Sequence, residues 1–298
     1  MSPRRVAITG GSGLIGGALS AHLSSRGDEV LHLVRRTART AAEISWNPAQ
    51  RRLDPAGLED VDAVVHLAGA GVADHRWSAA QKQAILASRA DGTAAVARAV
   101  AAHGSRIRLV SGSAVGYYGS DRGEEILTEE SSNGTGFLAE VVRAWEDATA
   151  PARDAGASVA MSRTGLVMTP RGGAFEPLLR LGRWGLAGPL GSGRQYWPWI
   201  TLEDTVRALA HLVDRADVTG PVNVVGPEPL PQREIVRELG SQLGRPSLLP
   251  APGFAVRAVI GEFAGEVLGS QRVVPAVLER TGFRYEHATL AAAVSTLL

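Results

Sequence analysis

The stretch Val6-Ala7-Ile8-Thr9-Gly10-Gly11-Ser12-Gly13-Leu14-Ile15-Gly16-Gly17-Ala18-Leu19 decides the fold. It begins as a short apolar run with β-branched residues, which is typical of a buried parallel strand. It then passes through glycines and continues with the apolar spacing of a helix. Gly11, Gly13 and Gly16 match the pattern G-x-G-x-x-G, whose glycines permit a tight turn, close approach to a pyrophosphate, and close helix–strand packing.

The residues after this turn supply the context that the glycine pattern needs. A second apolar strand is expected at 29–34, and the helix between the strands would offer unpaired N–H groups and a positive dipole end to an anion. We therefore expect a dinucleotide site here rather than a plain structural turn. The residues expected to contact the dinucleotide are Gly10, Gly11, Ser12, Gly13, Leu14, Ile15 and Gly16.

Two arginines, Arg35 and Arg36, end the second predicted strand. Sites that select NAD place an acidic residue there for the ribose 2′-hydroxyl, whereas guanidinium groups suit the 2′-phosphate of NADP. A solvated basic loop is the alternative interpretation. The position favours NADP as the cofactor.

Composition narrows the class of protein. The 298 residues include 45% hydrophobic and 20% charged residues, carry a formal net charge of +1, and contain no cysteine. These values predict a globular cytoplasmic protein with no bulk attraction to nucleic acid or membrane. The seven histidines show no spacing typical of metal ligands, so no metal site is expected.

Strand and helix patterns alternate along most of the chain, which predicts an α/β fold of the Rossmann type with a doubly wound parallel sheet. A smaller C-terminal α/β substrate domain should follow. The expected division is 1–170 for the nucleotide domain and 171–298 for the smaller one, with 200–225 returning to the first. Further strands are expected near 44–46 and 52–53, at 62–71, 106–110, 158–167 and 222–225, and helices at 78–103, 134–155, 203–215 and 232–243.

Several motifs together resemble one family. The glycine turn, Leu67-Ala68-Gly69 and Ser111-Gly112-Ser113 resemble the extended short-chain dehydrogenases/reductases. Asp74-His75-Arg76-Trp77, Gly116-Tyr117-Tyr118-Gly119, the run 188–200 and the C-terminal run 268–275 narrow the resemblance to the atypical, epimerase-like 39U oxidoreductases. The resemblance covers essentially the whole chain. It implies an NADP-dependent oxidoreductase or epimerase acting on a small polar or nucleotide-sugar-like substrate.

The resemblance also implies cofactor contacts beyond the glycine turn. Leu67, Ala68 and Gly69 form a small-residue turn at the end of one predicted strand, and such turns lie where open α/β sheets bind ligands. Ser111 and Gly112 follow the next strand. Thr164 and Gly165 come where the backbone of the superfamily passes the nicotinamide ring.

One departure affects the chemistry. The superfamily uses a Tyr-x-x-x-Lys pair for proton transfer, and the matching helix, Gly136 to Glu146, contains neither residue type. Ser113 stands where the superfamily places a serine or threonine that polarises a carbonyl, and Tyr117 is the nearest phenol, so both are the expected catalytic residues. If the segment is extended, Tyr118 should point away from Tyr117. Packing of both tyrosines beneath the loop remains the alternative.

Four residues are expected to contact a substrate: Arg76, Arg89, Arg194 and Trp197. For each arginine the alternative is a simple surface position. Arg163 is expected to be an internal ion-pair partner. Trp184, Trp197 and Trp199 either stack on a planar substrate or fill a seam between the domains.

The leading hypothesis is therefore an NADP-binding enzyme of the extended short-chain dehydrogenase type. An NADP-binding regulatory or interaction protein with little turnover is the alternative, favoured by the missing tyrosine and lysine. The partners expected are a small-molecule substrate, no nucleic acid and no membrane, and a homodimer is left open.

Overall fold

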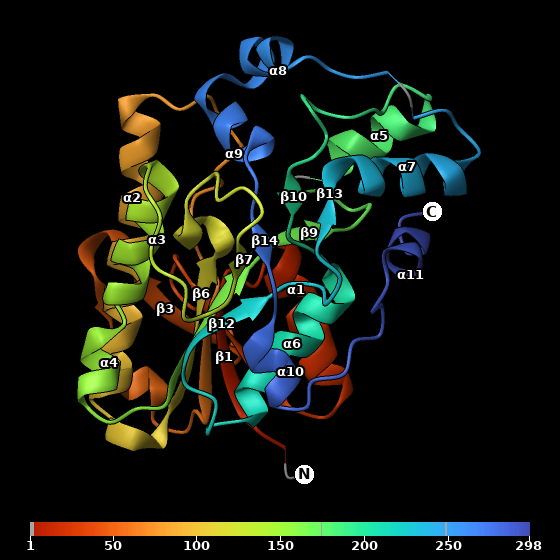
Figure 1. Ribbon diagram of the computed structural model, residues 1–298. Coiled ribbons are helices and arrows are strands. Elements are labelled where there is room, and N and C mark those ends of the chain that lie inside the picture. The colour runs from red at the N-terminus through yellow and green to blue at the C-terminus, as the bar shows by residue number, and fades with distance from the viewer. Residues whose placement is uncertain (1–2, 174, 248) are drawn as a thin grey trace.

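An eight-stranded sheet forms the centre of the computed structural model, which describes residues 3–173, 175–247 and 249–298 (Figure 1). The strands are β1 (Arg5–Thr9), β2 (Glu29–Val34), β3 (Glu43–Asn47), β4 (Arg52–Leu53), β5 (Ala63–His66), β6 (Arg108–Ala114), β8 (Val159–Thr164) and β12 (Gly220–Val224). Their order is β12-β8-β6-β5-β1-β2-β3-β4, and all neighbours are parallel except β3 and β4. The chain order reverses between β1 and β5, which makes the sheet doubly wound. The predicted α/β class and Rossmann-type sheet are confirmed.

Helices cover both faces of this sheet. Helices α1 (Leu14–Ser25) and α6 (Leu202–Asp214) pack on one face, where their leucines meet Ile8 of β1. Helices α2 (Ala79–Ala101) and α4 (Ala150–Asp154) pack on the other face against Ala7, and α3 (Phe137–Asp147) lies against α2. Because successive strand residues point to opposite faces, Val6 and Ile8 of β1 enter one apolar layer and Ala7 enters the other, so the middle of the strand must be apolar.

The remaining elements lie beside the sheet and above it (Figure 1). Three short strand pairs are β7 (Ile126–Leu127) with β14 (Arg272–Val273), β9 (Leu166–Met168) with β11 (Trp199–Thr201), and β10 (Tyr196–Trp197) with β13 (Leu230–Pro231). The further helices are α5 (Glu176–Arg183), α7 (Gln232–Leu243), α8 (Gly253–Ile260), α9 (Ala264–Leu268), α10 (Ala276–Arg280) and α11 (Leu290–Ser295). Buried side chains of α5, α7 and α11 form a separate apolar cluster. The expected domain boundary at residue 170 stays a prediction.

Several local predictions are confirmed. The side chain of Ser78 accepts a hydrogen bond from the N–H of Gln81 and caps α2 at the expected residue. β3 and β4 form the expected strand pair near residues 44–53.

Two expected elements are divided in the structure. The strand expected at 158–167 is interrupted at Gly165, where a Cβ would overlap the carbonyl oxygen of Pro198. As a result, β8 stays in the main sheet while β9 pairs with β11. The helix expected at 134–155 is divided into α3 and α4.

Within the described ranges, no helix combines the length and apolar character that crossing a membrane requires.

The segment after α9 fastens the C-terminal region to the loop that follows β6. The Nε2 group of Gln271 donates to the carbonyl oxygens of Val115 at 3.2 Å and Gly119 at 2.5 Å. Gly269 lies so close to the chain that a Cβ there would overlap the carbonyl oxygen of Ser120. The loop that carries Tyr117 is therefore held in place by residues about 150 positions further along the chain.

This close approach predicts a stability difference between two glycines four residues apart. Gly269→Ala should lower the free energy of unfolding by about 1–3 kcal/mol, because the added methyl group forces the docked segment apart. Gly265→Ala is the matched control, because nothing lies within 4 Å of its Cβ position. Urea unfolding of both variants checks this, and equal stability of the two would show that the segment is not docked as described.

Candidate functional site

The glycine turn between β1 and α1 leaves little space for side chains. Gly10 has φ +71°, and a Cβ there would lie 3.0 Å from the backbone nitrogen of Ala68. The N–H of Gly13 donates to the carbonyl oxygen of Gly10 at 2.9 Å, and a Cβ on Gly16 would overlap that same oxygen. Helix α1 thus begins directly at the carboxyl end of β1. Gly13 caps it without a side chain and is exposed, so the first N–H groups of the helix are open to an anion.

A threonine joins this turn to the next one. The hydroxyl oxygen of Thr9 accepts hydrogen bonds from the N–H groups of Leu67 at 2.9 Å and Ala68 at 3.1 Å. It also lies 2.8 Å from Nδ1 of His66. The structure therefore brings the predicted turn at 67–69 directly beside the glycine turn, at the point where the strand order reverses.

His66 is fully buried beneath these turns. Burial lowers the pKa of its imidazole to about 4, so the ring is neutral at physiological pH. The ring packs edge-on against Trp46 with centroids 5.9 Å apart, and its Nε2 has no hydrogen-bond partner among the described residues. A neutral His66 is thus part of the support for the 67–69 turn.

The two arginines after β2 have different surroundings. Arg36 forms two hydrogen bonds with Glu43, at 2.8 and 2.5 Å, and these hydrogen bonds lower the pKa of Glu43 to about 2. Arg35 is exposed, and its side chain has no hydrogen bond or ion pair within the described ranges. Arg35 is therefore the better placed of the two to bind an added anion.

The predicted residues on the other half of the sheet also lie at its carboxyl edge. Gly112 is packed so tightly that a Cβ would lie 2.8 Å from the ring of Trp145. The hydroxyl group of Ser111 is buried and donates to the carbonyl oxygen of Gly112. Thr164 and Gly165 are half-buried at the end of β8. A ligand at this edge would meet mainly backbone groups.

Ser113, at the end of β6, belongs to a buried polar network. Its hydroxyl group donates a 2.6 Å hydrogen bond to Oε1 of Glu146 on α3. Glu146 in turn binds Arg163 of β8 through two hydrogen bonds of 2.8 Å. The exposed fractions of the three residues are only 5%, 9% and 3%. Burial opposes the charge on Arg163, but its bonds to Glu146 outweigh that effect and raise its pKa. The expected internal pairing of Arg163 is present.

Both tyrosines after β6 contact the same arginine. The guanidinium carbon of Arg163 lies 3.4 Å from the ring centroid of Tyr117, which is half-buried. Tyr118 is fully buried, donates to Oδ1 of Asn223 at 2.7 Å, and accepts from Arg163 at 3.1 Å. Burial raises the pKa of Tyr118 to about 12.

Tyr118 was expected to point away from Tyr117 if this segment were extended, and that condition is not met. Residues Val115–Tyr118 form a 3₁₀ turn rather than an extended segment, and the two rings meet edge to face with centroids 5.4 Å apart. Of these two tyrosines, Tyr117 is the one whose hydroxyl group has no hydrogen bond within the described part of the chain.

The arginines proposed for a substrate are dispersed. Arg76 donates to the carbonyl oxygens of Ala258 and Val259 at the end of α8, so its guanidinium is already engaged there. Arg89 donates to the carbonyl oxygen of Ala70 and lies over the ring of Trp145, and burial lowers its pKa to about 10. Arg194 is exposed. The structure brings Arg89 near the predicted cofactor turn, while Arg76 binds the C-terminal region.

The tryptophans have mainly structural surroundings. Trp199 is buried and donates to the carbonyl oxygen of Glu228. Trp197 is half-buried and donates to the carbonyl oxygen of Val267 in α9. Trp184, by contrast, is 78% exposed at the end of α5. The predicted substrate contact by Trp197 stays a prediction, and its indole holds α9 against β10.

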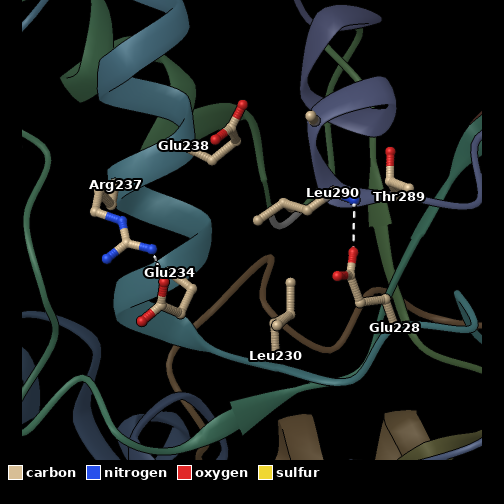
Figure 2. Close-up of a pocket in the computed structure, with 8 residues that line it drawn as sticks. Glu228, Leu230, Glu234, Arg237, Glu238, Thr289 and Leu290 are labelled. Atoms are coloured by element: carbon tan, nitrogen blue, oxygen red, sulfur yellow. Dashed lines mark hydrogen bonds and ion pairs between the residues drawn. The ribbon is translucent and has the colours of Figure 1, made fainter.

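A pocket between α7 and α11 involves none of the predicted site residues (Figure 2). Glu228 accepts a 2.9 Å hydrogen bond from the N–H of Leu290 at the start of α11, and Glu234 pairs with Arg237 on α7. The side chains of Leu230 and Leu290 lie between the two helices (Figure 2). These contacts join α11 to the rest of the chain, and the carboxyl edge of the main sheet remains the candidate site.

The sequence reasoning missed three residues of this site: Thr9, His66 and Glu146. Glu146 follows Val142 by four residues, so a charged group stands on the apolar face of an expected helix. That pattern signals a buried partner. Thr9 and His66 lie at the ends of apolar strands, where a polar residue is a sign of a hydrogen bond to a neighbouring turn.

The chain is similar to known families and proteins along most of its length. Residues 6–226 match the NAD dependent epimerase/dehydratase family, and residues 251–297 match a domain of unknown function, DUF1731. The epimerase family protein MT2273 of Mycobacterium tuberculosis (strain CDC 1551 / Oshkosh) is 46% identical over 290 residues, which are 97% of this chain and 96% of that protein.

Two solved structures are similar over nearly the whole chain. The human epimerase family protein SDR39U1, solved with NADPH, has a TM-score of 0.89 at 31% identity, covering 98% of both chains. A nucleoside-diphosphate sugar epimerase from Corynebacterium glutamicum has a TM-score of 0.82 at 36% identity, covering 99% of this chain and 58% of that one.

The buried histidine predicts a pH-dependent stability. Its folded pKa of about 4 lies below the unfolded value of 6.5, so below pH 6.5 the unfolded chain binds a proton that the folded chain does not. Above pH 6.5, protonation of His66 takes nothing from the free energy of unfolding. As the pH falls from 6.5 to 4, this protonation lowers the free energy of unfolding by about 3 kcal/mol at most. Urea unfolding at several pH values should show that acidification lowers the free energy of unfolding less in His66→Gln than in the wild type. Parallel pH profiles of the two proteins would contradict this.

The glycine turn predicts a selective loss of binding. Gly13→Val should abolish dinucleotide binding, because its side chain would stand at the exposed helix start where the pyrophosphate approaches. The fold should survive, since Gly13 has φ −80° and the one close neighbour of a Cβ there, the Gly10 oxygen at 3.2 Å, would have to move by only a few tenths of an ångström. NADPH titration calorimetry, with the thermal unfolding midpoint as the folding control, checks this. Wild-type affinity in the variant would place the phosphates elsewhere.

Proposed function

This chain belongs to the NAD dependent epimerase/dehydratase family, and we propose that it is an NADP-dependent oxidoreductase or epimerase. Its substrate would be a small polar or nucleotide-sugar-like molecule bound at the carboxyl edge of the main sheet. The observation that carries the proposal is the pair of joined turns at residues 10–16 and 67–69, beside an exposed Arg35.

The residues present fit NADP. Gly10, Gly13 and Gly16 leave the close approach that a pyrophosphate needs, and Arg35 offers an unengaged guanidinium after β2, where a 2′-phosphate would lie. The similar human protein was solved with NADPH, which supports the same choice here. The bound cofactor would supply a hydride as NADPH or accept one as NADP⁺.

The chain's own residues would orient the substrate and move a proton. Tyr117 is the phenol available for proton transfer, because the hydroxyl group of Tyr118 is already bonded to Asn223. Arg163, held flat by Glu146, supports the ring of Tyr117 from one face. Ser113 supplies a hydroxyl group at the end of β6, just before the loop that carries Tyr117. Gln271 fixes that loop from the C-terminal region.

A second function remains in view: an NADP-binding regulatory or interaction protein with little turnover. A specific observation favours it. Helix α3 contains neither tyrosine nor lysine, so no residue on it can act as the usual acid–base pair. Screening ketones, aldehydes and nucleotide sugars for NADPH oxidation, together with NMR detection of epimerised nucleotide sugars, distinguishes the two. Tight NADPH binding without any turnover would favour the regulator.

Cofactor choice provides a direct prediction. NADP(H) should bind at least tenfold more tightly than NAD(H), which corresponds to about 1.4 kcal/mol. Arg35→Ala should remove most of this preference. Arg36→Ala should remove less, because Arg36 is already paired with Glu43. Calorimetry with both dinucleotides measures the preference, and equal affinities in the wild type would rule out selection of NADP.

The catalytic assignment predicts two losses of turnover. Ser113→Ala and Tyr117→Phe should each lower turnover by roughly tenfold to a thousandfold, the range expected when a positioned hydrogen bond or proton path is lost. NADPH affinity should survive in both. Steady-state rates on a substrate found by the screen, with calorimetry as control, check this. An activity that ignores both substitutions would require the proton to come from water or substrate.

A further inference from the structure

The hydroxyl hydrogen of Ser113 is already committed inside the protein. It lies in the 2.6 Å hydrogen bond to Oε1 of Glu146. Glu146 is a carboxylate bound through both oxygens to the guanidinium of Arg163, so it has no hydrogen to return. Arg163 cannot accept one either. Within this buried network the direction of the bond is therefore determined: the serine donates and the glutamate accepts.

A serine in this position has only lone pairs left for a ligand. A hydroxyl group carries one hydrogen and two acceptor sites, and no described group donates to Oγ of Ser113. Turning the hydroxyl group outward would break a charge-assisted bond and leave a buried carboxylate oxygen with one partner fewer. A serine that polarises a carbonyl group must donate a hydrogen bond to it. Ser113 has only acceptor sites left, so it can only accept a hydrogen bond from a ligand.

We propose that Ser113 accepts a hydrogen bond from a hydroxyl group of the substrate, and that Glu146 is the positioning residue that sets this polarity. The site would therefore bind the alcohol form of a substrate pair in preference to the ketone form. This inference rests on the proposed function, in that it assumes a small polar substrate beside the cofactor. It names the substrate class more narrowly: a molecule whose hydroxyl group faces the end of β6.

The remaining hydrogen bonds of Arg163 hold its guanidinium in place beside Glu146. Its Nη1 donates to the hydroxyl oxygen of Tyr118 and to the carbonyl oxygen of Glu129, at 3.1 and 3.3 Å. The guanidinium is thus fixed in its plane and cannot leave Glu146 without losing several bonds. Because Glu146 stays paired, the Ser113 hydroxyl keeps the same acceptor whether or not a ligand is present.

The polarity itself is tested on the wild-type protein alone. Neutron diffraction from crystals exchanged into deuterium oxide should show the Ser113 deuteron between Oγ and Glu146. A deuteron on any other side of Oγ would overturn the proposal. This measurement needs neither cofactor nor substrate, so its outcome is independent of the proposed function.

The consequence for binding is tested with matched probes. Glycerol with dihydroxyacetone, and cyclohexanol with cyclohexanone, are pairs that differ in one hydroxyl group. Each alcohol is titrated into the NADPH-loaded protein and each ketone into the NADP⁺-loaded protein, so that neither reacts, and binding is followed by saturation-transfer NMR. Ser113→Ala should weaken alcohol binding at least tenfold and leave ketone binding within twofold.

Two further variants complete the test. Ser162→Ala removes a buried hydroxyl group from the neighbouring strand, where it donates to the carbonyl oxygen of Ser111, and should leave both probes unchanged. Glu146→Gln should narrow the difference between alcohol and ketone, because an amide can donate to Ser113 and free its hydrogen. If Glu146→Gln does not fold, Ser113→Ala and the neutron density still decide. The proposal would be overturned if Ser113→Ala weakened alcohol and ketone binding equally, or if neither alcohol bound to the wild-type protein. Failure of NADPH to bind would instead remove the proposed function.

Discussion

Backbone contact at the start of α1 is the constraint on which the candidate site depends. The carbonyl oxygen of Gly10 occupies the space of a Cβ on Gly16, and a Cβ on Gly10 would press against Leu67 and Ala68. Three chain segments therefore meet with no side chain between them. This contact places the first turn of α1 at the carboxyl end of β1, where the strand order reverses. A larger residue at either glycine would separate the helix from the sheet and block access to its N–H groups.

The other half of the site depends on a buried ion pair. Removing two charges from water costs free energy, so the pair of Glu146 and Arg163 is weak evidence for stability. Loss of one partner alone, however, would leave an uncompensated buried charge and cost about 3–5 kcal/mol. The pair connects α3 to β8, fixes the hydroxyl group of Ser113, and supports the ring of Tyr117. Glu146 lies near the end of α3, which contains neither tyrosine nor lysine, and Arg163 lies on β8.

Local sequence patterns predicted most of the fold. The apolar run before the glycines, the cap at Ser78 and the short strands around residues 44–53 each depend on neighbours in the chain, and the structure has them as expected. The turn after β6 was harder to predict from the sequence. Residues Val115–Tyr118 form a 3₁₀ turn, and Gln271 holds it from about 150 residues away. Periodicity carries no information about such a partner.

The side-chain partners were the least predictable part of the site. Arg76 donates to carbonyl groups about 180 residues further along the chain, and Ser113 finds its acceptor on a helix 33 residues away. Which arginine stays unengaged after β2 depends on Glu43 in the neighbouring strand. Residue types therefore predicted the kind of site, while the tertiary contacts determine which groups remain free to act.

A crystal structure of this chain with NADPH tests the central claim most directly. In that structure the pyrophosphate should lie against the N–H groups of residues 11–16, and the 2′-phosphate should be within hydrogen-bonding distance of the Arg35 guanidinium. An ordered dinucleotide elsewhere on the molecule, or a 2′-phosphate that no side chain after β2 contacts, would contradict it.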